Sequence, residues 1–99
     1  MGQSKSKQAA KFFTEGNSFF ENNAYNKAIS SYDQAIKMDS TDLKFYLNKG
    51  NALNALHQYS AAIKCYDEVI EIDPLYYLAY YNKGNLMLNN NHAQNTLKV

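Results

Sequence analysis

Apolar and small side chains recur at helical spacing in two successive stretches of the chain. The first stretch shows the spacing i, i+1, i+4, i+7 and i+8, which places its members on one face of an α-helix. Its members are Phe12, Phe13, Gly16, Phe19 and Phe20. A second amphipathic stretch begins at Tyr25 and ends near Ile36, after an interruption at Asn22 and Asn23. The pattern predicts two helices joined by a short turn.

The same pattern returns at a constant interval along the chain. Gly16, Gly50 and Gly84 are spaced by this interval, and an asparagine follows each of them. A fixed period of this size is typical of stacked helical repeats. We therefore predict an all-α solenoid of about two and a half units, with repeats over residues 9–42 and 43–76 and a partial repeat over residues 77–99.

Polar clusters mark the expected helix ends. Ser, Thr or Asp within residues 39–42 are suited to capping the next helix, and Asp73-Pro74 is expected to end the second repeat, with Pro74 as the first residue of the following helix. We expect that helix to occupy residues 75–89 and to cap the second repeat. A turn is predicted at residues 89–92, followed by a stub over residues 93–99.

The glycines are predicted to lie inside helices, where each costs about 1 kcal/mol relative to alanine. Their recurrence indicates close contact between helices. The expected partners are alanines of the second helix in the same repeat, Ala28 for Gly16 and Ala62 for Gly50.

Composition narrows the class of protein. The chain has 99 residues, enough for one small domain, and a net charge of +1, which argues against a partner held by nucleic-acid phosphates. Residues 1–8 are polar and basic and are expected to form a flexible tail before a domain over residues 9–99. Cys65 is the single cysteine, so no internal disulfide is possible and a reducing compartment is expected.

Catalytic and metal-binding patterns are absent from the sequence. No Cys/His cluster has metal-ligand spacing, and we find no phosphate loop and no nucleophile–base pair, so we expect neither enzyme activity nor a cofactor. Cys65 is interpreted as a packing residue. Asp33 and Asp67, which recur at the repeat period, indicate either a solvated helix face or a polar contact between repeats.

The second repeat reads Tyr46-x2-Lys49-Gly50-x2-Leu53, then Ala62-x3-Tyr66, then Pro74. This resembles the tetratricopeptide repeat, and the resemblance covers about residues 9–92. The family resemblance implies antiparallel helix pairs stacked in a right-handed superhelix. It also implies a concave face, lined by the first helix of each repeat, that receives a peptide.

The resemblance assigns groove positions on all three repeats. They are Phe13, Asn17, Phe20, Lys44, Leu47, Asn48, Asn51, Tyr81, Asn82 and Asn85. A carboxamide both donates and accepts hydrogen bonds, so a row of asparagines could hold a peptide backbone. The alternative is that asparagine beside the glycine is only repeat consensus in an Asn-rich chain.

Some members of the family grip the acidic C-terminus of heat-shock chaperones with two asparagines and three cations. Asn17 and Asn48 match the asparagines, but the cationic positions fall on Phe13, Leu78 and Asn82. Without those cations a terminal carboxylate loses its charge-assisted partners. A less acidic, partly apolar peptide is therefore expected.

The N-terminal sequence Met1-Gly2-Gln3-Ser4-Lys5-Ser6 matches an N-myristoylation pattern in which Gly2 is acylated. The alternative is that this match is a coincidence. One acyl chain binds membranes weakly, and Lys5, Lys7 and Lys11 could add attraction to an anionic leaflet. We expect a cytoplasmic adaptor that binds protein or peptide, peripheral on a membrane. The alternative is a structural module that self-associates as a homo-oligomer through residues 77–99.

Overall fold

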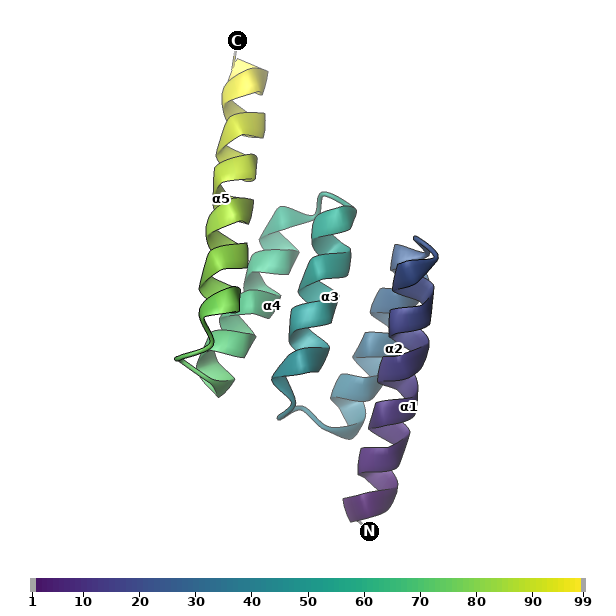
Figure 1. The fold of residues 1–99 in the computed structure, drawn as a ribbon. Coiled ribbons are helices and arrows are strands. Elements are labelled where there is room, and N and C mark those ends of the chain that lie inside the picture. The colour runs from purple at the N-terminus through teal and green to yellow at the C-terminus, as the bar shows by residue number, and fades with distance from the viewer. Residues whose placement is uncertain (1, 99) are drawn as a thin grey trace.

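Five helices follow one another in the computed structural model, which describes the backbone of residues 2–98 and the side chains of residues 5–89. They are α1 (Gly2–Glu21), α2 (Tyr25–Met38), α3 (Leu43–Ala55), α4 (Tyr59–Ile72) and α5 (Tyr77–Lys98). Neighbouring helices run antiparallel, and α1, α3 and α5 line one face (Figure 1). No strand occurs between Gly2 and Lys98. The predicted all-α solenoid of about two and a half repeats is confirmed.

The turns within the first two repeats are equivalent. Asn23 and His57 occupy the same position of successive repeats and have positive φ values of 62° and 61°. Asn and His are among the residues that adopt this left-handed conformation most readily without being glycine. Backbone bonds close each turn, from Ala24 N to the Phe19 oxygen and from Gln58 N to the Leu53 oxygen.

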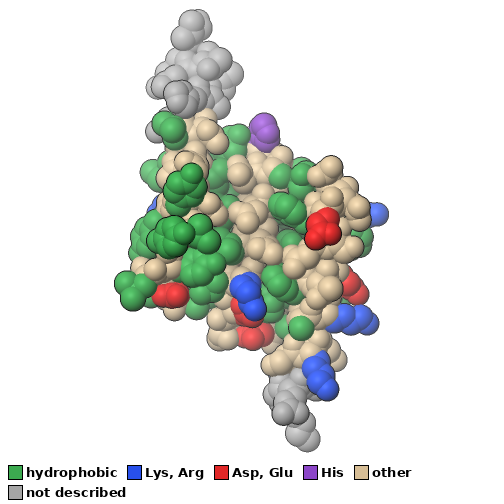
Figure 2. All heavy atoms as spheres, viewed as in Figure 1, with side chains coloured by type: hydrophobic (Ala, Val, Ile, Leu, Met, Phe, Trp, Pro, Cys, Tyr) green, Lys and Arg blue, Asp and Glu red, His purple; other side chains and the backbone are tan. Residues whose placement is uncertain are grey.

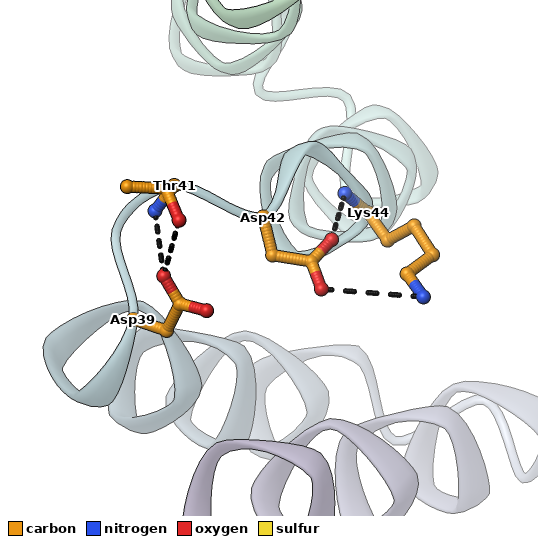
Figure 3. Close-up of polar contacts among 4 residues, drawn as sticks. All are labelled: Asp39, Thr41, Asp42 and Lys44. Carbon is orange, nitrogen blue, oxygen red and sulfur yellow. Dashed lines mark hydrogen bonds and ion pairs between the residues drawn. The ribbon is translucent and has the colours of Figure 1, made fainter. Parts of the chain in front are cut away.

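Carboxylates organise the connection between α2 and α3 (Figure 3). Asp39 accepts from the backbone N of Thr41 at 3.0 Å and from its Oγ1 at 2.6 Å, and these bonds lower the pKa of Asp39. Asp42 caps α3 by accepting from Lys44 N at 3.0 Å. Asp73 repeats the first motif by accepting from Leu75 N. The capping expected within residues 39–42 is confirmed.

All five helices contribute to the core, and α2 and α4 supply most of its largest fully buried side chains. Tyr32, Tyr66 and Val69 are almost completely buried, together with Leu86 from α5. Leu86 packs in the same cluster as Tyr66 and Cys65, so α5 covers the second repeat as expected. Burial raises the pKa of Cys65 to about 11, and the thiol acts as a packing residue.

Three boundaries differ from the prediction. Helix α1 begins at Gly2, where residues 1–8 were expected to be a flexible tail. Helix α5 begins at Tyr77, because Pro74 lies in the preceding turn. It then continues to Lys98 without the turn predicted at residues 89–92. In the first two repeats a packed second helix stabilises the corresponding turn.

None of the helices between residues 2 and 98 combines the length and apolar character needed to cross a membrane.

Candidate functional site

Each of the first two glycines makes room for a tyrosine ring. A Cβ atom built on Gly16 would lie 2.5 Å from Tyr32 Cε1, and one on Gly50 would lie 2.7 Å from Tyr66 Cε1. Close contact between helices is confirmed, but the partners are these tyrosines rather than alanines. The alanine pairing that we expected is therefore wrong. Gly84 has no such neighbour within 4 Å.

The same tyrosines reach the asparagine beside each glycine. Tyr32 Oη donates to Asn17 Oδ1 at 2.6 Å, and Tyr66 Oη donates to Asn51 Oδ1 at 2.5 Å. Each bond joins the first helix of a repeat to the second and fixes the asparagine carboxamide. This role was not predicted, although the same spacing from asparagine to tyrosine occurs in both repeats.

A further bond joins the two repeats on the side lined by the first helices. Asn48 Nδ2 donates to Asn17 Oδ1 at 2.9 Å. Because the oxygen of Asn17 already accepts two bonds, its Nδ2 group is the part that it presents to a ligand. Asn48 presents its Oδ1 and its second N–H. The pair can therefore both donate to a carbonyl and accept from an N–H.

These side chains surround a hollow of about 240 Å³. Its lining consists of Asn17, Phe20, Glu21, Tyr32, Asn48 and Asn51. The hollow is smaller than the roughly 300–1,000 Å³ typical of sites that enclose a small molecule. Its size suits one side chain or a short stretch of backbone from a larger ligand.

The charge in this lining is negative. Glu21 is its charged member and is exposed at the rim, while the other lining residues are neutral. Burial raises the pKa of Tyr32, and the Glu21 carboxylate adds to the shift. The phenol therefore stays neutral, and a carboxylate placed in the hollow would face repulsion without a cation to pair with.

The structure brings together Asn17, Phe20, Asn48 and Asn51 from the expected groove positions. Phe13 is instead partly buried, with its ring centroid 5.8 Å from that of Tyr32 and 5.1 Å from that of Phe45. Leu47 packs against the second-repeat core.

The remaining expected positions lie outside the hollow. Lys44 is exposed at the start of α3, 4.0 Å from Asp42. On α5, Tyr81 and Asn85 are exposed and Asn82 is half-buried. Gly2, the expected lipidation residue, begins α1 but falls outside the residues whose surroundings are described.

The lysine before each of the last two glycines pairs with an aspartate of the preceding repeat. Lys49 Nζ lies 2.6 Å from Asp33 Oδ1, and Lys83 Nζ lies 2.7 Å from Asp67 Oδ1. Burial alone would lower the pKa of Lys49, but the Asp33 carboxylate raises it overall. Of the two interpretations left open for Asp33 and Asp67, the polar contact between repeats is the one observed.

No three His, Cys, Asp or Glu side chains gather as metal ligands within residues 5–89. The hollow combines neutral hydrogen-bonding groups with the Glu21 carboxylate at its rim. It can orient and hold a backbone, and it places no nucleophile beside a base.

Comparison with known proteins places three overlapping family matches on the chain. A family model described as TPR repeat matches residues 16–56, and two described as tetratricopeptide repeat match residues 43–76 and 65–97. Together they span most of the chain. No curated protein matches it.

Several solved structures share the fold. The TPR domain of Arabidopsis OM64 is 21% identical with a TM-score of 0.85, covering 91% of this chain and 74% of that one. The TPR2B domain of yeast Sti1, in a complex with an Hsp70 peptide, is 27% identical with a TM-score of 0.83, covering 94% and 74%. The second TPR of Spaghetti (RPAP3), bound to the HSP90 peptide SRMEEVD, is 26% identical with a TM-score of 0.85, covering 92% and 83%.

Proposed function

Because this chain belongs to the tetratricopeptide-repeat family, we propose that it is an adaptor that binds an extended segment of a partner protein across its concave face. The observation that carries this proposal is the Asn17–Asn48 hydrogen bond, which holds two carboxamides at the rim of one hollow. Members of this family serve as protein-interaction modules, and two of the similar structures were solved with bound peptides.

The peptide that we propose differs from the acidic peptide SRMEEVD of the RPAP3 complex. The hollow is lined by neutral groups and Glu21, so it offers a carboxylate no cation. Phe13 is held in an aromatic cluster, and Leu78 and Asn82 are neutral residues on α5. These groups fit a peptide segment without a terminal acidic cluster. An apolar side chain of the segment would contact Phe20, and its backbone would form hydrogen bonds with the asparagines.

Peptide selection on the full chain tests this proposal. Phage-displayed random peptides would be enriched on the wild type, and the selected peptides synthesised and measured by fluorescence anisotropy. Asn48→Ala should weaken them by about fivefold or more, the value of one lost hydrogen bond. Asn26→Ala makes the same change on the exposed surface of α2 and should have no effect.

The peptide SRMEEVD serves as the acidic comparison. It should bind about tenfold or more weakly than the selected peptides, because it lacks cationic partners here. Enrichment of acidic C-termini, or equal binding to wild type and Asn48→Ala, would contradict the proposal.

We further propose that the N-terminal end of α1 contacts an anionic membrane on the cytoplasmic face. Lys5, Lys7 and Lys11 are all exposed on α1, and cationic side chains lie near the N-terminal end of the chain in Figure 2. Each would contribute about 1 kcal/mol near such a surface, and an acyl chain on Gly2 would supply the apolar anchor.

Co-sedimentation with vesicles containing phosphatidylserine, after co-expression with an N-myristoyltransferase, tests the membrane proposal. Gly2→Ala and the triple change of Lys5, Lys7 and Lys11 to Gln should each reduce the bound fraction. An unmodified N-terminus by mass spectrometry would end the lipid part. Self-association through residues 77–99 remains the alternative role, and a concentration-dependent mass in sedimentation would support it.

A further inference from the structure

Helix α5 exposes a face whose equivalents on α1 and α3 are covered. Met87 is 48% exposed, whereas Leu53, one repeat earlier, is 6% exposed. Tyr81 is 64% exposed, whereas its equivalents Phe13 and Leu47 are half-buried. Apolar side chains cluster over the first half of α5 in Figure 2. We call this face, formed by Tyr77, Tyr80, Tyr81, Gly84 and Met87, the Gly84 face.

The first two repeats show what covers such a face. On α2 the covering residues are Ala28, Tyr32 and Ala35, and on α4 they are Ala62, Tyr66 and Val69; each is no more than 1% exposed. Both helices therefore present a small residue, a tyrosine four positions later, and a small or β-branched residue three positions after that. The tyrosine ring fills the space that the glycine leaves.

The hydrogen-bonding partner of that tyrosine is also in place on α5. Asn85 follows Gly84 as Asn17 follows Gly16 and Asn51 follows Gly50. Gly84 and Asn85 are exposed, and nothing described lies within 4 Å of a Cβ built on Gly84. The third repeat thus keeps the glycine and the asparagine of a tyrosine site.

We propose that the Gly84 face docks an amphipathic helix of a partner protein with the pattern Ala-x3-Tyr-x2-Ala or Val, its ring over Gly84 and its hydroxyl bonded to Asn85. A second copy of this chain would have to unpack its own Tyr32 or Tyr66 to supply such a helix. Residues 89–98 continue along α5 past the position where α1 and α3 turn, so they lead away from this face.

Peptides from the chain itself provide the probe. A fluorescent peptide of residues 25–38, with a hydrocarbon staple joining the exposed positions 30 and 34, presents Ala28, Tyr32 and Ala35 as a formed helix. It should bind the full chain in trans. Tyr32→Phe in the peptide should weaken binding about fivefold through the lost hydroxyl, and Tyr32→Ala should weaken it by more than about tenfold through the lost ring.

On the protein, Gly84→Leu fills the ring space and should reduce binding by more than about tenfold. Ser18→Leu adds the same side chain at an exposed position of α1 and should change nothing. Circular dichroism checks that both variants stay folded. Loss of binding with Asn48→Ala but not with Gly84→Leu would assign the peptide to the concave hollow and overturn the proposal.

Two further outcomes would also overturn it. One is the absence of binding by the stapled wild-type peptide. The other is a dimer of the chain, detected by sedimentation, that is abolished by Gly84→Leu and is not displaced by the peptide. Such a dimer would mean that a second copy of the chain occupies the Gly84 face. A failed peptide selection on the concave face leaves this inference untouched, since the two surfaces are probed by different ligands and variants.

Discussion

Among single residues, Gly50 and Gly84 occupy equivalent helical positions with opposite surroundings. A methyl group on Gly50 would press on the buried ring of Tyr66, so Gly50→Ala should lower the free energy of unfolding by about 1–3 kcal/mol. Gly84 has open space around it, so Gly84→Ala should raise that free energy by up to about 1 kcal/mol through helix propensity. Urea unfolding measures both, and changes of the same sign would contradict this account.

Tyr66 makes stability sensitive to alkaline pH. Burial raises its pKa from 10.0 to about 12, because the fold favours the neutral phenol. The contribution of the neutral Tyr66 phenol to the free energy of unfolding is fully present below pH 10 and is lost as the pH rises toward 12. A difference of two pKa units corresponds to at most about 2.7 kcal/mol.

The measurement is urea unfolding at pH 8 to 12 in a Cys65→Ala background. This background is needed because burial raises the pKa of the Cys65 thiol from 9.0 to about 11, so that ionisation of the thiol also lowers the free energy of unfolding from pH 9 upward. Tyr66→Phe should flatten the decline above pH 10. An unchanged decline in this variant would assign the alkaline sensitivity to other groups.

Of the candidate site, the sequence allowed prediction of the asparagines but not of their partners. The period placed Asn17 and Asn48 on the first helices, and the structure brings them together at 2.9 Å. The Tyr32 hydroxyl was missed, because a periodic aromatic is equally consistent with pure core packing. Only the rotation of α2 about its axis decides that the ring crosses Gly16 and reaches Asn17.

Among the elements, α3 depends on its N-terminal cap. The Asp42 carboxylate accepts from Lys44 N, and the nearby Lys44 ammonium at 4.0 Å is an exposed, weak partner. Asp42→Ala should lower the free energy of unfolding by about 1 kcal/mol, since it leaves an N–H of the first turn without its acceptor.

Asp42→Asn is the matched control, because asparagine keeps the acceptor and removes the charge. It should retain most of the stability in thermal unfolding at neutral pH. Equal losses in the two variants would show that charge rather than capping holds this end of the helix.

Helix α5 shows where a local pattern fails to predict an element's end. The asparagines at positions 22 and 23 end the first hairpin helix, and those at 89–91 do not end α5. Asparagine is compatible with both a helix and a turn. In the first repeat α2 packs back onto α1 and stabilises the turn. The asparagines themselves do not encode that tertiary contact.

For the molecule as a whole, stability should decrease toward α5. Each helix packs mainly against its neighbours in the chain, as in other helical arrays, so damage at one end stays local. Leu86→Ala, at a buried α5 position, should speed amide exchange in α5 and α4 and leave α1 and α2 nearly unchanged.

Phe45→Ala is the comparison, because Phe45 is buried where the two repeats meet. It should speed exchange in all helices by a similar factor, since both repeats lose packing. Uniform exchange in the Leu86→Ala variant would mean that the array unfolds as a single unit.

The fold was largely predictable because its information is repeated. Gly16, Gly50 and Gly84 establish one period, and the helical spacing around each establishes one element type. The contacts that differ between repeats were less accessible. These contacts depend on whether another helix packs against the repeat, which the local sequence does not show. The exposed Gly84 has the same local sequence as the buried Gly50.

Phenol–carboxamide bonds and ion pairs are two kinds of polar joint that alternate along this array. Inside each full repeat the joint is a neutral phenol on a carboxamide, Tyr32 on Asn17 and Tyr66 on Asn51. Between repeats it includes a half-exposed ion pair, Lys49 with Asp33 and Lys83 with Asp67. Added salt screens the ion pairs and has little effect on the neutral phenol–carboxamide bonds. Ionic strength therefore weakens the joints between stacked hairpins and leaves those inside each hairpin largely unchanged.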